Sequence, residues 1–116
     1  MKISYLEIPV TDMHRAVAFY AHAFSVEPKV LDLGAVQMAL LTDQITLVQY
    51  PAAYIPSNPA GVLAYFFTDD MNAALHRISE AGGKVLREKT QVNESFGFMA
   101  LFEDSEGNRL ALQSKE

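Results

Sequence analysis

The sequence predicts an α+β fold made of two copies of one βαβββ module, and two observations support this prediction. The 116 residues repeat at an offset of about half the chain length. Within each half the hydrophobic pattern changes in the same order, from strand-like alternation to helical spacing and back to short strands. A chain of this length buries one core but has little room for two. We therefore expect a single domain over residues 1–116, with module one at about 1–50, a linker at 51–61 and module two at about 62–116.

The repeat is visible in three segments that occur in the same order in both halves. The aligned pairs are Asp12 and Asp70 at an offset of 58, Met38 and Met99 at 61, and Gln49 and Gln113 at 64. A chance match of scattered alanines and leucines is the alternative interpretation. Three matches in the same order favour duplication, with the small drift in offset explained by loop insertions.

In module one, residues 3–10 alternate between apolar and other side chains, as in a half-buried strand. A helix is expected next, because Thr11 or Asp12 offers an N-cap oxygen and apolar residues then recur at helical spacing from Met13 to Phe24. Three short strands complete the module. They are expected at about residues 29–33, 36–41 and 45–50, with a tight polar turn between the last two.

Module two follows the same plan. A helix is expected from Met71 to about Ala81, where Gly82 and Gly83 provide a left-handed stop. The expected strands lie at about residues 62–68, 84–87, 96–102 and 109–114. Between the modules, prolines at 51, 56 and 59 interrupt regular structure and indicate the linker.

Composition excludes several classes of function. The chain has no cysteine, so it has no disulfide, thiolate metal site or cysteine nucleophile. A net charge of −5 disfavours nucleic acid and anionic membrane surfaces and makes neutral or cationic ligands easier to accept. No apolar run approaches a membrane span, and the N-terminus lacks the pattern of a signal peptide. A cytoplasmic location is therefore expected.

Two motifs resemble a known family. The run IPVTDMHRAVAFY at residues 8–20 resembles the first strand and helix of the vicinal-oxygen-chelate superfamily, which includes glyoxalase, bleomycin-resistance protein and extradiol dioxygenase. The run FEDSEGNRL at residues 102–110 resembles its final hairpin. The resemblance covers essentially the whole chain and is nearest to the short glyoxalase-like branch. It implies U-shaped mixed sheets around a cavity with the helices outside, and modules that face each other within a chain or across a homodimer.

The resemblance also implies where a divalent metal would bind, namely to four side chains from the first and last strands of the two modules. Counting along this sequence from the motifs gives Tyr5, Leu47, Leu63 and Ala111. A phenol, two alkyl chains and a methyl group lack the nitrogen and carboxylate donors that such ions require. His14, His22 and His76 are expected on solvent-facing sides of the helices. We therefore predict no metal and no cofactor.

If odd-numbered residues of the first strand face the cavity, the lining is apolar and aromatic with one carboxylate and two amides, the usual composition of a small-molecule site. The alternative is that these side chains only fill the sheet interior. The predicted ligand-binding residues are Tyr5, Glu7, Leu47, Gln49, Leu63, Tyr65, Phe67, Ala111 and Gln113.

Two classes of function stay open. The first is a metal-independent binding protein of the glyoxalase/bleomycin-resistance type, which holds a small apolar or aromatic compound, cationic or neutral. The alternative is a glyoxalase-like lyase, isomerase or dioxygenase in which Glu7 acts as the general base. The expected partners are the small molecule and a second copy of the chain, with neither nucleic acid nor membrane.

Overall fold

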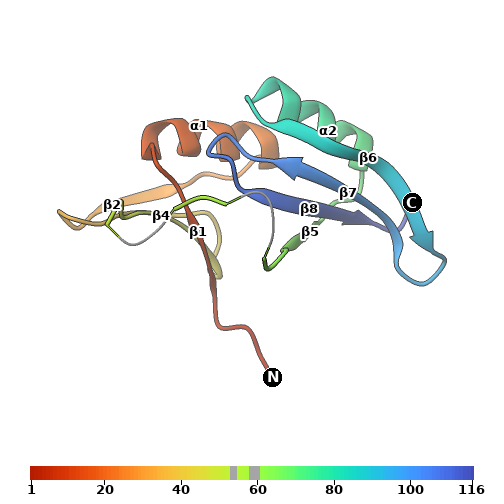
Figure 1. Ribbon diagram of the computed structural model, residues 1–116, viewed down its shortest axis with the longest axis horizontal. Coiled ribbons are helices and arrows are strands. Elements are labelled where there is room, and N and C mark those ends of the chain that lie inside the picture. The colour runs from red at the N-terminus through yellow and green to blue at the C-terminus, as the bar shows by residue number, and fades with distance from the viewer. Residues whose placement is uncertain (53–54, 58–60) are drawn as a thin grey trace.

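The computed structural model describes residues 1–52, 55–57 and 61–116, so the predicted linker lies partly outside the described residues. Two four-stranded sheets lie beneath two helices (Figure 1). In chain order the elements are β1 (Leu6–Pro9), α1 (Met13–Phe24), β2 (Lys29–Asp32), β3 (Gln37–Leu40), β4 (Ile45–Gln49), β5 (Tyr65–Phe67), α2 (Met71–Glu80), β6 (Lys84–Asn93), β7 (Gly97–Glu103) and β8 (Arg109–Ser114).

Both sheets have the same topology. Sheet one has the order β1-β4-β3-β2 and sheet two the order β5-β8-β7-β6. In each, the first strand of the module pairs parallel to the last, and the remaining pairs are antiparallel. The predicted α+β fold of two βαβββ modules is confirmed. Neither helix of the described chain is long and apolar enough to cross a membrane.

The two helices begin in the same way. The N-caps Asp12 and Asp70 have φ/ψ values of −136°/100° and −137°/94°. The Oδ1 atom of each aspartate accepts a hydrogen bond of 3.1 Å from the backbone N–H three residues later, that of Arg15 or Ala73. These bonds satisfy N–H groups that have no partner inside the helix. The repeat offset of 58 is therefore accurate for β1, β5 and the helices.

Three predicted strands have clearly different limits, and the one expected over 62–68 is reduced to β5 at Tyr65–Phe67. The first strand begins at Leu6 instead of Ile3. The bond from the Leu6 N–H to the Gln44 carbonyl lies at the turn where β4 begins, so β4 does not extend far enough to pair with earlier residues. Residues before Leu6 have no partner on β4 among the pairs described. Strand β6 continues to Asn93, well beyond the predicted end near Arg87, since register shifts let it follow β7 along its length.

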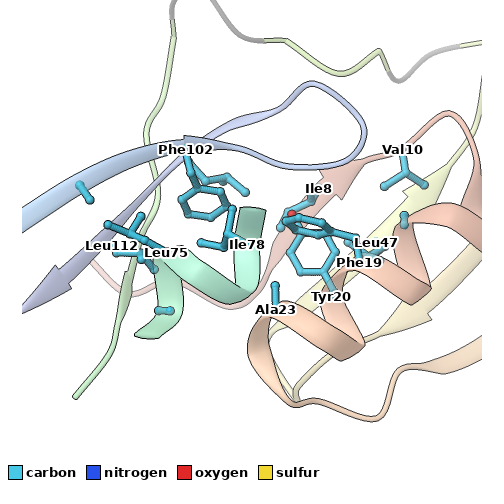
Figure 2. Packing of buried hydrophobic residues seen from close by; sticks show 14 of the residues in the cluster. Ile8, Val10, Phe19, Tyr20, Ala23, Leu47, Leu75, Ile78, Phe102 and Leu112 are labelled. Atoms are coloured by element: carbon cyan, nitrogen blue, oxygen red, sulfur yellow. The ribbon is translucent and has the colours of Figure 1, made fainter. Parts of the chain in front are cut away.

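One hydrophobic core lies between the helices and both sheets (Figure 2). Phe19 and Tyr20 of α1 are 1% exposed, and Ile78 of α2 and Phe102 of β7 are fully buried. Strand side chains alternate between two faces, so every second strand residue points toward this core. Within the part of the chain that the structure describes, the other sheet face carries no helix (Figure 1).

We call this helix-free side of both sheets the open face. Its strand residues are those that alternate with the core-facing ones. They include Glu7, Pro9, Met38, Leu40, Thr46 and Val48 in sheet one, and Tyr65, Phe67, Met99, Leu101, Ala111 and Gln113 in sheet two.

Candidate functional site

Four of the five predicted site residues of module two, Tyr65, Phe67, Ala111 and Gln113, lie on the open face. Tyr65 pairs with Ala111 and Phe67 with Gln113, while the intervening Phe66 packs toward the core. Tyr65 is 44% and Phe67 60% exposed. The Gln113 side chain is held in place, because its Nε2 donates 2.9 Å to the Phe96 carbonyl. Sheet two therefore presents aromatic surface and an amide on the side away from the helices.

Three further predicted site residues, Tyr5, Glu7 and Leu63, belong to the first predicted strand of each module, and they do not all lie on the open face. Glu7 lies on the open face of β1 and is half-buried. Tyr5 precedes β1 and is 57% exposed. Leu63 precedes β5 and is half-buried. Of these three residues, only Glu7 lies within a strand.

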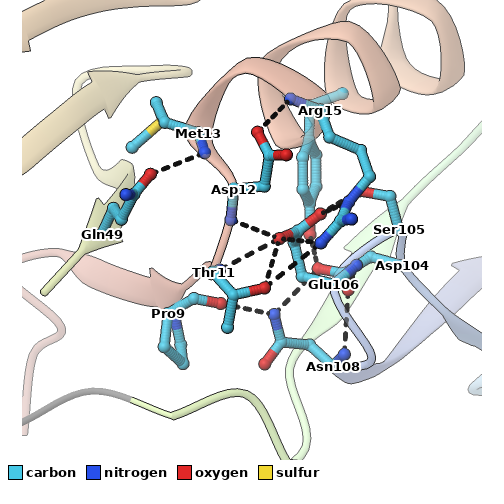
Figure 3. A network of polar contacts seen from close by, with 11 residues as sticks. Pro9, Thr11, Asp12, Met13, Arg15, Gln49, Asp104, Ser105, Glu106 and Asn108 are labelled. Atoms are coloured by element: carbon cyan, nitrogen blue, oxygen red, sulfur yellow. Dashed lines mark hydrogen bonds and ion pairs between the residues drawn. The ribbon is translucent and has the colours of Figure 1, made fainter. Parts of the chain in front are cut away.

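The placement of Leu47 and Gln49 on this face is wrong. Leu47 is fully buried in the core, in register with Ile8. The Gln49 Oε1 accepts 2.7 Å from the Met13 N–H at the start of α1 (Figure 3). Thr46 and Val48 occupy the open face instead.

The error comes from a slip of one residue in the repeat alignment. Pro9 pairs with Val48 in module one, and its counterpart Phe67 pairs with Gln113 in module two. Val48 therefore corresponds to Gln113, an offset of 65 instead of 64. Because side chains alternate along a strand, a slip of one residue reverses the face of every side chain.

A cavity of about 240 Å³ lies at the seam between the two sheets, and Glu7 is the predicted site residue in its lining. We call it the seam pocket. Its walls come from β1, from the segments before β5 and from the start of β8. The lining residues are Leu6, Glu7, Ile8, Pro9, Ile55, Ser57, Val62, Ala64, Asn108, Arg109 and Leu110. Tyr5, Leu63, Tyr65, Phe67, Ala111 and Gln113 lie outside this lining.

Hydrogen bonds hold one wall of the seam pocket in place. The Arg109 N–H donates 3.2 Å to the Ser57 carbonyl, and the Asn108 Oδ1 accepts 3.4 Å from the Ser57 N–H. The Arg109 Nη2 donates 3.3 Å to the Gly61 carbonyl. Sequence reasoning missed Asn108 and Arg109 as pocket residues, because the Gly-Asn-Arg run was interpreted only as a turn and the start of a strand.

A buried carboxylate, Glu106, joins the modules beside this pocket (Figure 3). Its side chain is fully buried and forms a 2.7 Å ion pair with the Arg15 Nε. Its Oε1 accepts from the N–H groups of Thr11 and Asp12 at 3.0 and 2.8 Å. Burial opposes ionisation, but the hydrogen bonds from Arg15, Asp12, Ser105 and Thr11 outweigh it and lower the pKa to about 2.

Asp104 is the second buried carboxylate of this joint. It accepts 2.7 Å from the Tyr20 hydroxyl of α1, and the Asn108 N–H and side-chain amide also donate to it. Burial raises the pKa of Asp104 despite these bonds, and burial also raises the pKa of Tyr20 well above its usual value. The Asn108 Nδ2 donates 2.7 Å to the Pro9 carbonyl, which ties the β7–β8 turn to β1.

The two motifs that carried the family resemblance therefore meet in space. Residues from the first motif, including Arg15 and Tyr20, bind residues from the second, including Asp104 and Glu106. These contacts define the intermodule joint. The joint connects β1 to the start of β8, and both segments line the seam pocket.

The donor set does not suit the divalent metal that the fold family implies. After the register correction, the four positions carry Tyr5, Thr46, Leu63 and Ala111. These supply a phenol, a hydroxyl and two groups without donors, whereas such ions bind imidazole or carboxylate. Over residues 1–52, 55–57 and 61–116 no group of three or more histidine, cysteine, aspartate or glutamate residues is arranged to hold a metal. His14, His22 and His76 are exposed on the helices.

Two mixed sheets of βαβββ topology, joined at a pocket-bearing seam, define the glyoxalase-like class of vicinal-oxygen-chelate folds. A model of the Glyoxalase/Bleomycin resistance protein/Dioxygenase superfamily matches residues 2–112. The chain belongs to this superfamily. A Glyoxylase-like domain-containing protein of Didymella fabae is 28% identical over 119 aligned positions, which cover 96% of this chain and 91% of the relative.

Solved structures share the fold. A glyoxalase/bleomycin resistance protein/dioxygenase family enzyme from Burkholderia phytofirmans PsJN superposes with a TM-score of 0.72 at 14% identity, over 100% of both chains. The fosfomycin resistance protein FosX of Mesorhizobium loti superposes with a TM-score of 0.71 at 16% identity, over 97% of this chain and 91% of that chain.

Proposed function

We propose that this chain is a metal-independent binding protein for a small apolar or aromatic compound, cationic or neutral, held at the seam pocket and the adjoining open face. The observation that supports this proposal best is the seam pocket, where Glu7 lines a cavity whose other walls are apolar apart from Ser57, Asn108 and Arg109. The Arg109 guanidinium donates to the Gly61 carbonyl. Pockets of this composition orient small ligands with a few polar groups and gain affinity from apolar burial. The superfamily includes resistance proteins by name, which is consistent with a ligand-binding role.

The size of the cavity limits the ligand. About 240 Å³ lies below the range of roughly 300–1,000 Å³ that is typical of sites for drug-sized molecules. A ligand confined to the pocket therefore has a single ring or a short chain. A larger ligand would extend onto the open face, toward Tyr65 and Phe67.

The proposal includes a homodimer and a cytoplasmic location. Tyr65 and Phe67 leave aromatic surface on the open face, which a second copy would cover. Light scattering at micromolar concentration should give twice the 12.8 kDa mass of one chain. A mass near that of one chain would remove the dimer from the proposal.

The test of binding uses two probes of nearly the same shape, phenyltrimethylammonium and tert-butylbenzene, which differ in charge. Glu7→Gln keeps the shape of the side chain and removes its charge. It should weaken the cation by about 1–3 kcal/mol, the value of a lost charged interaction, and leave the neutral probe unchanged. Isothermal titration calorimetry measures both affinities. Glu94→Gln, in the exposed turn between β6 and β7, is the matched control.

Equal binding of both probes by wild type and Glu7→Gln would contradict a role for Glu7 in recognising a cation. The enzymatic alternative predicts a different pattern. If Glu7 is a general base, the substitution leaves binding nearly intact and lowers any turnover by a factor of about 100 or more.

A further inference from the structure

A second cavity, of about 180 Å³, lies on the helix side of the molecule, away from the open face. We call it the α1 pocket. Tyr20, Phe24 and Val26 line it from α1 and the residues after the helix, and the β3–β4 hairpin provides a second wall. Module two contributes one aromatic ring to this lining, that of Phe66. The full lining is Tyr20, Phe24, Val26, Leu41, Thr42, Ile45 and Phe66.

The chemistry of the α1 pocket selects against charged ligands. Its lining has two side-chain hydroxyls, and both already form hydrogen bonds. The Tyr20 hydroxyl donates to Asp104 at 2.7 Å, and the Thr42 Oγ1 accepts from the N–H groups of Gln44 and Ile45 at 3.1 Å each. A charged ligand would lose its hydration here and find no charged side chain in this lining, which is unfavourable. A neutral apolar ligand has no such cost.

Aromatic rings from both modules line this volume, which is partly open to solvent. Tyr20 and Phe24 stack with centroids 5.7 Å apart, and Phe24 meets Phe66 edge to face, also at 5.7 Å. Such rings offer both faces and edges to an aromatic guest. The volume is also of the right scale, because an apolar cavity of about 150 Å³ lined by similar side chains binds benzene.

The repeat places other side chains at the equivalent positions, and two of these side chains, Ile8 and Leu110, line the seam pocket instead. The positions equivalent to Tyr20, Leu41, Ile45 and Phe66 in the other module are Ile78, Phe102, Leu110 and Ile8. All four counterparts are buried, at 0–6% exposure, whereas Leu41, Ile45 and Phe66 are only half-buried.

On the module-two side, the Phe19 ring of α1 packs close to Gly83. A Cβ added at Gly83 would lie 2.8 Å from the Phe19 ring and 2.8 Å from Ile78. The repeat counterpart of Phe19 is Arg77. Its Nε donates 3.1 Å to the Ala23 carbonyl at the end of α1, so this side chain makes a polar contact where Phe19 fills a hydrophobic space.

We propose that the α1 pocket is a binding site for a small neutral aromatic molecule. This site is separate from the seam pocket and does not depend on Glu7 or on the proposed function. Its ligand contacts residues of both modules, so binding should also stabilise the packing of module one against module two.

The test is a methyl-resolved NMR titration of the full chain with toluene. Saturable shifts are expected at the methyl groups of Val26, Leu41 and Ile45, with none at Val62 beside the seam pocket. Val26→Trp should fill the cavity and weaken toluene at least tenfold. Val92→Trp, a matched change at an exposed position of β6, should leave the affinity unchanged.

Thermal unfolding of each variant checks that the fold is retained, and Ile45→Phe is a second filling variant if Val26→Trp does not fold. Absence of saturable shifts up to the solubility limit of toluene would overturn the proposal. Shifts centred on Val62 would overturn it too, because they would place toluene in the seam pocket. So would undiminished binding to a folded filling variant.

Discussion

The two modules have the same topology and the same N-cap geometry, but their final turns differ in what they contact. In module one the β3–β4 turn is closed locally, by Thr42 accepting from Gln44 and Ile45. In module two the β7–β8 turn reaches across to module one, through Asp104 to Tyr20 and through Glu106 to Arg15. One copy of the turn is therefore a surface hairpin and the other forms the joint between modules.

The difference is clearest at two aspartates that the repeat makes equivalent. Asp43 lies exposed in the short turn, whereas Asp104 is 3% exposed and accepts hydrogen bonds from both modules. The comparison shows that duplicated sequence positions retain backbone geometry while their side chains take on unrelated roles. Stability should consequently be unequal between equivalent positions.

The largest effect is expected at Asp104. Asp104→Ala leaves the Tyr20 hydroxyl and the Asn108 groups without their acceptor in a buried place, and should cost about 3–5 kcal/mol of unfolding free energy. Asp43→Ala should change it by less than about 0.5 kcal/mol. Urea denaturation measures both. Comparable losses at the two positions would contradict the asymmetry between the turns.

Glu106 should give the next largest effect, and one that depends on pH. Its folded pKa of about 2 lies below the ordinary 4.5, so ionised Glu106 stabilises the fold above pH 4.5. This stabilisation, about 3 kcal/mol, is lost as the pH falls toward 2. The raised pKa of Asp104 acts in the opposite direction, because protonating Asp104 removes a buried charge. The difference between wild type and Glu106→Gln isolates the Glu106 contribution.

Urea unfolding at several pH values should show this difference shrinking on acidification from 5 toward 2. Glu94→Gln, in an exposed turn, provides the control and should give a small difference. A difference between wild type and Glu106→Gln that stays constant over this pH range would show that the carboxylate is not the stabilising group.

A smaller effect should be equal in the two modules. Asp12→Ala and Asp70→Ala each remove one N-cap hydrogen bond of 3.1 Å from helices that begin with nearly identical backbone angles. Each should cost about 1 kcal/mol, the usual value of a cap. Thermal or urea unfolding should agree for the two within about 0.5 kcal/mol. A much larger loss at Asp12 would mean that its side chain also supports the joint.

The smallest effect is expected from a metal chelator. The positions where a family metal would connect strands of both modules carry Tyr5, Thr46, Leu63 and Ala111, which do not provide a suitable donor set. We expect less than about a tenth of an equivalent of Zn, Ni, Fe or Mn per purified chain, and no change of melting temperature with EDTA. Stoichiometric metal by elemental analysis would contradict this prediction.

The sequence predicts the fold well, because both helices carry strong caps and helical apolar spacing, and because the repeat restricts the topology. It predicts the site less well. The offset rises from 61 at β3 to 65 at β4, so the β7–β8 connection is four residues longer than the β3–β4 connection. Aligning Gln49 with Gln113 allows only three of these residues, so the alignment that correctly places Met38 on Met99 slips by one at β4. A single slip reversed Leu47 and Gln49, whereas Tyr65, Phe67, Ala111 and Gln113 were placed on the correct face.

The seam pocket could not be predicted from either half alone. Its walls meet through contacts between Asn108 and Pro9, which are 99 residues apart, and between Arg109 and Ser57. Local periodicity carries no information about such distant contacts. The two family motifs were recognised separately, and only the fold reveals that they touch.

The intermodule joint has a consequence for how the chain is made. The start of α1 is completed by Glu106 and the middle of the helix by Asp104, at sequence separations of 84 to 95 residues. During synthesis, the residues of module one are made before these carboxylates. Until the second module is made, the Tyr20 hydroxyl and the Arg15 guanidinium of α1 are hydrated and lack their partners Asp104 and Glu106. Contacts so distant in sequence slow folding, and they make the final hairpin the segment whose arrival completes both halves at once.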